Sequence, residues 1–359
     1  MKSNNDPLFV FRWHSSPVNA ANFFSQHLFV TGDQEGNIIV WSTILKKRYA
    51  TLLKAHSDSI ICVYGVLLNN NIYIISQGRD NLIKIWKLTT QEFTGDLSLE
   101  DSFHVDSLCF TLFSVTESKT TKYVAALSNT DDNTVLIYDI LNRKTVLVSL
   151  GKSTRHPSND KNAMCTSLKI LFISEGIFGL VCGNEDGSLA YYQLNIESKN
   201  YKLLNDIQIN NDTILSVAMN NKKSIISFGG ASKQITLINF DENLGIGSVF
   251  GTIETQNQGI GSLVFSNDDT VLAVGCWDYR VRLYDVKKLE YITKLKYHSG
   301  AISMVSFYPG INTVENHENH KDSTLLRVSN TKKSNNRSQP WLIVSSHDCR
   351  VSMWSKTIP

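Results

Sequence analysis

The sequence predicts an all-β fold, a seven-bladed β-propeller closed by an N-terminal strand that completes the last blade. Three observations support this prediction: a motif that recurs along the chain, short alternating apolar runs separated by polar turns, and a strand-like segment that precedes the first repeat. The chain has 359 residues, of which 42% are hydrophobic and 19% are charged. This balance supports a large buried core and argues against disorder.

The recurring motif is a polar turn followed by an alternating run that ends in a large apolar residue. Its clearest copies are GDQEGNIIVW (32–41), GRDNLIKIW (78–86) and SHDCRVSMW (346–354). The seven copies end at Trp41, Trp86, Tyr138, Tyr192, Ile238, Tyr284 and Trp354. These residues lie 45 to 54 positions apart, with 70 before the last, close to the ~40–45-residue period of a propeller blade with loops added. The sequence therefore predicts seven blades.

Each copy contains strands joined by hairpins. An apolar run such as LFVTG (28–32) or VLAVG (271–275) precedes the turn, and residues alternate with period 2 after it. We find no convincing amphipathic helix in the sequence. Because radial closure removes exposed sheet edges, we predict a single propeller domain over residues 1–359.

The two ends of the chain predict how the ring closes. Residues 351–354 form the third strand of the last blade, and its fourth strand is missing there. We expect Leu8–Arg12 to pair outside residues 351–354, since an unpaired strand leaves backbone groups open to aggregation. Residues 310–339 are rich in Asn, Ser, His and charge, so we predict a flexible polar insertion within blade seven.

A set of polar residues recurs with the motif. In the second repeat it comprises His56, Ser76, Asp80 and Trp86, with the Asp six positions before the Trp. Glu35 takes the Asp position of the first repeat by the same count. The predicted set over all repeats is His14, Thr31, Trp41, His56, Ser76, Asp80, Trp86, His104, Ser128, Asp132, Asp186, Asp278, His298, Asp348 and Trp354.

This set and its period resemble WD40 repeats, and the resemblance covers nearly the whole chain. In that family the Asp and His side chains bond each other and the hydroxyl bonds the Trp indole. The resemblance implies that the set locks each turn to the next blade. A charge-assisted hydrogen bond of this kind contributes ~1.5–3 kcal/mol to stability.

Alternative chemical interpretations are weaker. A His–Ser–Asp triad would occur once, whereas this set recurs at blade spacing, so we predict a structural role and no enzyme. The segment 151–153 (GKS) resembles the end of a phosphate loop, but Val146 stands where that pattern requires glycine. His317 and His320 lie in polar text without a companion Cys, which favours a solvated loop over a metal site. We therefore expect no cofactor and no metal.

Composition limits the partners and the compartment. A formal net charge of +2 gives no reason to expect direct nucleic-acid binding. The sequence contains no run of 18 apolar residues, so we expect no membrane span. The six cysteines include no C-x-x-C pair, which favours reduced thiols in the nucleus or cytosol. Lys332, Lys333 and Arg337 form either an import signal or an ordinary charged loop.

A narrower resemblance rests on the first two repeats and the last two. GDQEGNIIVW, LLKAHSDSI (52–60) and SQGRDNLIKIW (76–86) resemble the fungal ASTRA-associated WD-repeat proteins, whose animal relative is the guanine-nucleotide-binding-protein β-subunit-like protein. Residues 271–307 are also similar to that family's penultimate repeat and the start of its last. Much of that likeness is carried by Gly275, Trp277, Asp278, Arg280 and Arg282.

This resemblance implies a non-enzymatic scaffold subunit in a nuclear assembly linked to chromatin remodelling. We expect the protein in the nucleus, with the cytoplasm as an additional location. The assembly would contain a co-chaperone trio, an AAA+ ATPase pair and a giant phosphatidylinositol-3-kinase-related protein, whose maturation it would assist. A true G-protein β subunit is a competing interpretation. Only residues 1–7 precede the first expected strand, which leaves no room for the helix that pairs with a γ subunit, so we expect none.

The residue before each turn Asp should stand exposed on one rim of the ring. These residues are Gln34, Arg79, Asp131, Glu185, Ala231, Trp277 and His347. Trp and Arg are enriched in binding hot spots, so we predict that blades 6, 7, 1 and 2 dock protein partners through Gln34, Arg79, Trp277 and His347. In the alternative, Trp277 packs on a neighbouring loop and Arg79 pairs with a local carboxylate. A second class of function is substrate recognition, as a histone-tail reader or ubiquitin-ligase adaptor.

Overall fold

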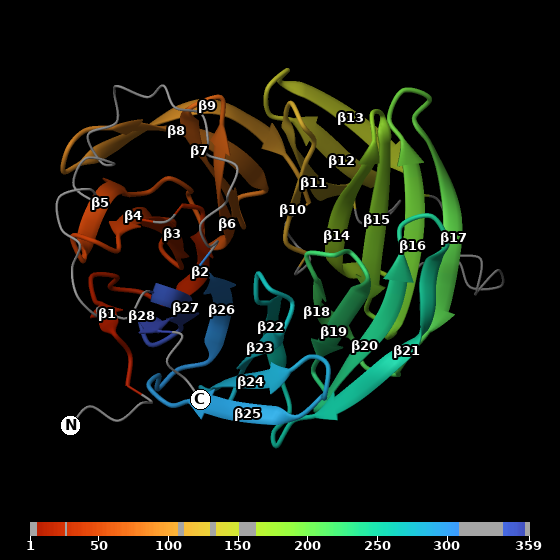
Figure 1. Cartoon of the computed structure of the whole chain (residues 1–359). Coiled ribbons are helices and arrows are strands. Elements are labelled where there is room, and N and C mark those ends of the chain that lie inside the picture. The colour runs from red at the N-terminus through yellow and green to blue at the C-terminus, as the bar shows by residue number, and fades with distance from the viewer. Residues whose placement is uncertain are drawn as a thin grey trace.

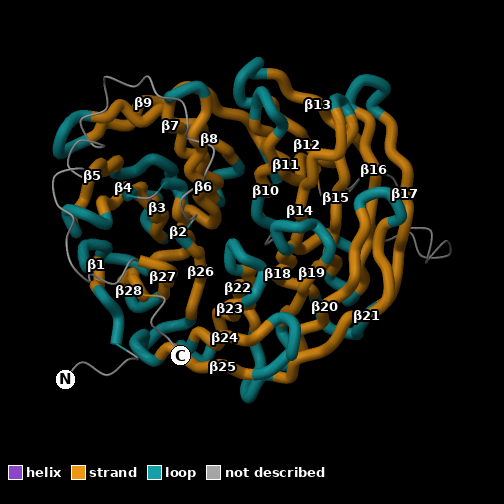
Figure 2. The backbone as a smooth tube through the Cα atoms, in the orientation of Figure 1, coloured by secondary structure: helices purple, strands orange, loops and turns teal. Residues whose placement is uncertain are grey.

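Seven four-stranded antiparallel sheets form a ring in the computed structural model (Figure 1). The structure describes residues 6–25, 27–106, 111–129, 134–150, 163–308 and 340–355. Within these ranges the chain forms strands and loops and no helix (Figure 2), and hence no helix that could cross a membrane. The predicted seven-bladed β-propeller is confirmed. The insertion predicted at 310–339 lies outside the described residues.

Blades 1 to 4 each take four consecutive strands of the chain, from the inner strand to the outer strand. Blade 1 contains β2 (Val18–Phe23), β3 (Leu28–Asp33), β4 (Ile38–Ser42) and β5 (Lys47–Leu52). Blade 2 contains β6 (Ile60–Leu68), β7 (Asn71–Gly78), β8 (Leu82–Thr90) and β9 (Gly95–His104). Blade 3 contains β10 (Ser114–Glu117), β11 (Lys122–Asn129), β12 (Thr134–Asp139) and β13 (Lys144–Ser149). Blade 4 contains β14 (Cys165–Ser174), β15 (Ile177–Asn184), β16 (Ser188–Asn195) and β17 (Asn200–Gln208).

The remaining blades complete the ring, and the last one joins both ends of the chain. Blade 5 contains β18 (Ile214–Met219), β19 (Ile225–Gly230), β20 (Gln234–Asp241) and β21 (Gly245–Glu254). Blade 6 contains β22 (Ile260–Phe265), β23 (Val271–Cys276), β24 (Val281–Asp285) and β25 (Tyr291–Leu295). Blade 7 contains β26 (Ile302–Phe307), β27 (Pro340–Ser346), β28 (Arg350–Ser355) and, on its outside, β1 (Phe9–Phe11).

The N-terminal strand closes the ring as predicted. β1 runs antiparallel to β28, with Phe9 opposite Met353 and Phe11 opposite Val351 (Figure 1). Phe11 is buried, and its ring centroid lies 4.9 Å from that of Phe29 and 5.1 Å from that of Trp41, both in blade 1. The strand therefore completes blade 7 and also packs against the first blade.

The hydrophobic core is divided into layers between neighbouring blades. In the layer between blades 1 and 2, Val30, Ile38 and Val40 pack with Ile60 and Ile74, all fully buried. The layer between blades 3 and 4 is built in the same way. Because each sheet alternates its side chains between two faces, every blade contributes to two layers.

Side-chain hydrogen bonds also join all seven pairs of neighbouring blades. In each, a polar side chain of one blade bonds the backbone of the next, and the last bond runs from blade 7 to blade 1. The pairs are Asn22 with Gly65, Gln77 with Phe113, Ser114 with Ile170, Thr166 with Ile214, Ser216 with Leu263, Ser262 with Val305, and Ser306 with Phe23. These bonds give buried polar groups partners at each blade interface, as burial requires.

Candidate protein-docking surface

The hairpin turn between the second and third strands of a blade is held against the loop that enters the same blade. The backbone N–H of the rim residue donates to a carbonyl of that loop at 2.9 Å for Gln34, Arg79 and Glu185 and at 3.0 Å for Trp277 and His347. The same anchor thus recurs in blades 1, 2, 4, 6 and 7. It fixes the backbone of the rim and leaves the side chains directed outward.

Blade 2 contains the complete polar set. Trp86 Nε1 donates to Ser76 Oγ at 2.8 Å, Ser76 Oγ lies 2.8 Å from His56 Nε2, and His56 Nδ1 lies 2.8 Å from Asp80 Oδ1. Since the indole can only donate, the serine hydroxyl donates to Nε2 and the Nδ1–H donates to the carboxylate. Every polar atom of the chain of bonds is then satisfied with a neutral imidazole.

The pKa shifts agree with this order of protons. Burial lowers the pKa of His56 below its usual value, although the Asp80 carboxylate opposes the change. Burial alone would raise the pKa of the Asp80 carboxyl, but the hydrogen bond and the charge interaction with His56 lower it overall. A neutral His56 that donates to an ionised Asp80 is the state that both shifts favour.

Blade 1 assembles the same set but with a different acid. His14 Nδ1 lies 2.7 Å from Asp33 Oδ2, and Trp41 Nε1 donates to Thr31 Oγ1 at 2.8 Å. Glu35, predicted in the Asp position, is exposed, so that prediction is wrong. Asp33 ends β3 and accepts the N–H of Glu35 at 3.0 Å. The hairpin has the same length as in blade 2, since Phe29 pairs with Trp41 as Ile74 pairs with Trp86, so the acid has moved two positions back within an equal turn.

Blade 7 assembles the set with a hydroxyl from another strand. His298 Nδ1 lies 2.9 Å from Asp348 Oδ2, and His298 Nε2 lies 2.7 Å from Ser352 Oγ. Trp354 Nε1 donates to the same Ser352 hydroxyl at 2.8 Å. Sequence reasoning missed Ser352 because it stands on β28 beside the Trp and not on β27, where the other blades carry the hydroxyl.

Blade 3 departs from the prediction. Val124 lies opposite Tyr138, so the register position of the hydroxyl is Ala126 and not Ser128, because two extra residues lengthen this hairpin. Tyr138 instead donates to Asp101 of blade 2 at 2.5 Å. His104 is exposed at the end of β9, and the described residues include no side-chain partner for it. Asp132 lies outside the described residues.

Blades 4 and 6 keep the turn Asp with new partners. Asp186 accepts hydrogen bonds from the N–H of Ser188 at 3.0 Å and from the Ser188 hydroxyl at 2.5 Å. Asp186 thus caps the turn in which it lies. Asp278 accepts two bonds from the buried Arg282 guanidinium, at 2.9 and 2.6 Å. Neither blade places a histidine beside its Asp among the described residues.

The polar sets therefore act within one blade. Each links the loop that enters a blade to a hairpin turn or strand of that blade, which corrects the expectation that it locks a turn to the next blade. Their polar atoms are engaged in internal bonds. No cluster of three or more His, Cys, Asp or Glu suited to a metal ion occurs in the described part of the chain.

The four rim residues proposed for docking, Gln34, Arg79, Trp277 and His347, are all exposed. Trp277 is 45% exposed. A Cβ added to Gly259 would lie 2.3 Å from Cε3 of the Trp277 ring, so the indole rests on the backbone of the entering loop. The alternative that Trp277 packs on a neighbouring loop is thus correct for one face of its indole. The same contact holds the other face of the indole toward solvent.

Tyr279 is a rim residue that the sequence analysis missed. It follows Asp278 in the same turn, is 45% exposed, and has a φ of 71°. Gly36, Asn81 and Gly187 hold this left-handed position in blades 1, 2 and 4, as their residue types allow. A tyrosine there costs roughly 1–2 kcal/mol, and strain of this kind is concentrated at functional sites. The sequence signal that could have identified Tyr279 is an aromatic residue at a turn position where most blades carry Gly or Asn.

Charge distinguishes the opposite part of the rim. In blade 4 the exposed Glu185 adjoins Asp186, and Asp212 of the following loop is also exposed. Asp131, predicted to extend this acidic arc into blade 3, lies outside the described residues. The rim thus differs between the aromatic surface of blade 6 and the acidic surface of blade 4.

Comparisons with known proteins agree with the geometry. The model of the WD domain, G-beta repeat, matches residues 5–42 and 46–87, and the model of the anaphase-promoting complex subunit 4 WD40 domain matches residues 217–309. Neither match includes blades 3 and 4.

Similar proteins cover most of the chain. ASTRA-associated protein 1 of Schizosaccharomyces pombe is 24% identical over 86% of this chain and 95% of its own length. The protein of that name from Verticillium alfalfae is 23% identical over 99% and 93%. The mouse guanine nucleotide-binding protein subunit beta-like protein 1 is 24% identical over 84% and 90%. The chain therefore contains WD40 repeats, forms a seven-bladed propeller and resembles ASTRA-associated protein 1 over most of its length.

Proposed function

We propose that the protein is a non-enzymatic scaffold subunit of a nuclear multiprotein assembly of the ASTRA type. The names of its relatives support this role, as does a fold whose recurring His, Ser and Asp side chains are engaged in internal bonds. The resemblance implies a link to chromatin remodelling and to the maturation of phosphatidylinositol-3-kinase-related kinases. Its partners in that role are a co-chaperone trio, an AAA+ ATPase pair and a giant kinase-related protein.

The observation that carries the docking role is the exposed aromatic pair on blade 6. Trp277 is held on Gly259, and Tyr279 occupies a strained backbone position, yet each side chain is 45% exposed. Fixed aromatic side chains lose little conformational entropy when a partner covers them. The rims of blades 7, 1 and 2 continue this surface with His347, Gln34 and Arg79.

Affinity purification of the tagged full chain, followed by mass spectrometry, tests the proposal. We expect the wild type to recover the co-chaperone trio and the giant kinase-related protein. Trp277→Ala and Arg79→Glu should each reduce that recovery, by about 30-fold where the residue is a hot spot worth about 2 kcal/mol. Circular dichroism must show that both variants are folded.

Glu185→Ala is the matched control, because Glu185 has the same backbone anchor and exposure but lies on the acidic rim of blade 4. It should retain the partners. If Trp277→Ala and Arg79→Glu are both folded and both recover the partners as fully as the wild type, the docking surface is rejected.

The aromatic pair also favours a second candidate function, the recognition of a methylated histone tail. Such readers enclose the methylammonium group in an aromatic cage, and Tyr279 adds a second exposed ring to Trp277. Recovery of histones without the co-chaperone trio would select this function over the scaffold. Recovery of a cullin would select the ubiquitin-ligase adaptor.

A further inference from the structure

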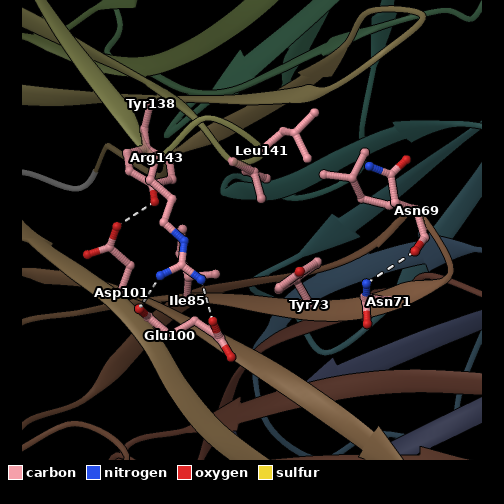
Figure 3. Close-up of a pocket in the computed structure, with 11 residues that line it drawn as sticks. Asn69, Asn71, Tyr73, Ile85, Glu100, Asp101, Tyr138, Leu141 and Arg143 are labelled. Atoms are coloured by element: carbon pink, nitrogen blue, oxygen red, sulfur yellow. Dashed lines mark hydrogen bonds and ion pairs between the residues drawn. The ribbon is translucent and has the colours of Figure 1, made fainter.

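A pocket of about 130 Å³ opens between blades 2 and 3. It lies at the ends of the blades opposite the docking rim, because it is bordered by the β6–β7 turn and the turn that follows β12. Figure 3 shows polar groups on two sides, with Tyr138, Arg143, Asp101 and Glu100 facing Asn69 and Asn71. Ile85, Ile140, Leu68, Leu141 and Tyr73 complete the lining.

Two bonds fix the charged wall. Arg143 Nη2 lies 2.5 Å from Glu100 Oε2, and the Arg143 side chain is 55% exposed at the mouth. The Tyr138 hydroxyl donates to Oδ2 of Asp101. The other carboxylate oxygen of Asp101, Oδ1, accepts a hydrogen bond from the N–H of Ser102 at 2.8 Å. Burial and the hydrogen bond with Asp101 raise the pKa of Tyr138, so its phenol stays a donor.

The pocket has more negative charge and more acceptors than its own groups use. The carboxylates of Glu100 and Asp101 face one guanidinium. Among the described residues, the Tyr73 hydroxyl, the Asn71 amide oxygen and the second Glu100 oxygen accept no hydrogen bond. Apolar side chains such as Ile85 and Leu141 line the rest. This combination suits an apolar stem that ends in a cation.

We propose that this pocket binds a single lysine side chain from a partner protein. A typical small-molecule site has a volume of about 300–1,000 Å³, so a pocket of about 130 Å³ takes one side chain and not a larger ligand. An ammonium group can donate to the open oxygen of Glu100, with Asn71 and Tyr73 as further acceptors in the lining, and the methylene stem would lie along Ile85 and Leu141. The proposal goes beyond the scaffold function and does not rest on it.

Lysine is favoured over arginine by what is already present. Arg143 already occupies one Glu100 oxygen. Tyr138 and the N–H of Ser102 occupy both oxygens of Asp101. Neither carboxylate therefore offers two free oxygens to the planar fork of a second guanidinium. A compact ammonium needs only a single carboxylate oxygen, and one oxygen of Glu100 remains open.

Methyl NMR of the full chain tests the proposal, with Nα-acetyl-lysine-N-methylamide as the probe. We expect saturable shifts of the Ile85 and Leu141 methyl signals. The norleucine analogue keeps the stem but lacks the ammonium, and it should bind at least roughly tenfold more weakly, the loss of one charge-assisted hydrogen bond. The arginine analogue should also bind more weakly. No saturable shift, or equal binding of either analogue, would overturn the proposal.

Variants locate the binding. Tyr73→Phe removes one acceptor without changing the fold, and Glu100→Gln removes the charge, so each should weaken the lysine probe. Glu117→Gln is the control, because Glu117 pairs with Lys122 at 2.8 Å outside the pocket. Lysine binding that survives both pocket variants, in proteins whose spectra show the native fold, would reject this site.

Discussion

Blades 2 and 5 hold their second and third strands together by different means. In blade 2, Ser76 and Trp86 are buried together and bonded. In blade 5 the same register positions hold Phe228 and Ile238, both fully buried. Replacing both members of a buried hydrogen bond by apolar groups is nearly neutral, whereas removing one leaves the other unsatisfied. A blade can therefore replace the whole polar set by apolar residues, but loss of one member alone destabilises it. The set is structural in every blade that has it.

Every blade has four strands, and truncation of residues 1–13 tests whether blade 7 needs its fourth. It removes β1, and loss of the buried Phe11 alone costs about 3–5 kcal/mol. This is a large part of the ~5–15 kcal/mol stability of a typical domain. We expect a large fall in Tm or loss of soluble protein. Truncation of residues 1–7 should change little, and an unchanged Tm after the longer truncation would refute ring closure by this strand.

Two serine variants test the polar set directly. Ser76→Ala leaves His56 Nε2 and Trp86 Nε1 without their partner, which we expect to cost about 2–5 kcal/mol in urea unfolding. Ser227 of blade 5 is also buried, but its hydroxyl has no hydrogen-bond partner in the described structure. Ser227→Ala should be neutral or slightly stabilising. Equal losses in the two variants would mean that the hydrogen bonds of blade 2 contribute nothing specific.

Blade 1 tests which acid completes its set. Asp33→Asn weakens the pair with His14 and the turn beneath Glu35, and we expect a loss of about 1–3 kcal/mol. Glu35→Gln lies on the exposed turn and should stay within about 0.5 kcal/mol of the wild type. Chemical denaturation of both variants measures the difference, and the reverse ranking would restore the assignment made by counting residues.

The smallest effect is the pH dependence of blade 2. The folded pKa of His56 is lowered, so the unfolded chain binds more protons below about pH 6.5 and stability falls as pH falls. The change is at most about 1.4 kcal/mol per pH unit for one proton. Asp80 also has a lowered pKa, so its contribution is lost only under more acidic conditions, below its unfolded value of about 3.9. Unfolding of the wild type and of His56→Gln between pH 7.5 and 5.5 should differ in slope, and parallel curves would contradict the neutral imidazole.

The sequence pattern was sufficient for the number of blades, the closing strand and the complete set of blade 2, because these depend on period and alternation. It failed where a turn changes length or a partner changes strand. Two added residues move the hydroxyl position of blade 3 from Ser128 to Ala126. In blade 1 the acid comes from Asp33 on β3 and not from Glu35 in the turn, although the hairpin is as long as that of blade 2. Ser352 and Tyr279 depend on side-chain packing and backbone conformation, which counting residues does not capture.

Hydrogen exchange of the free protein and of the protein within its purified assembly tests whether blades 6, 7, 1 and 2 form the docking surface. We expect slower exchange in the assembly at the rim turns 33–37, 78–81, 276–281 and 346–350, and unchanged exchange at 184–188 in blade 4. Protection confined to the blade 4 turn, or no protection at the four turns, would contradict docking through blades 6, 7, 1 and 2.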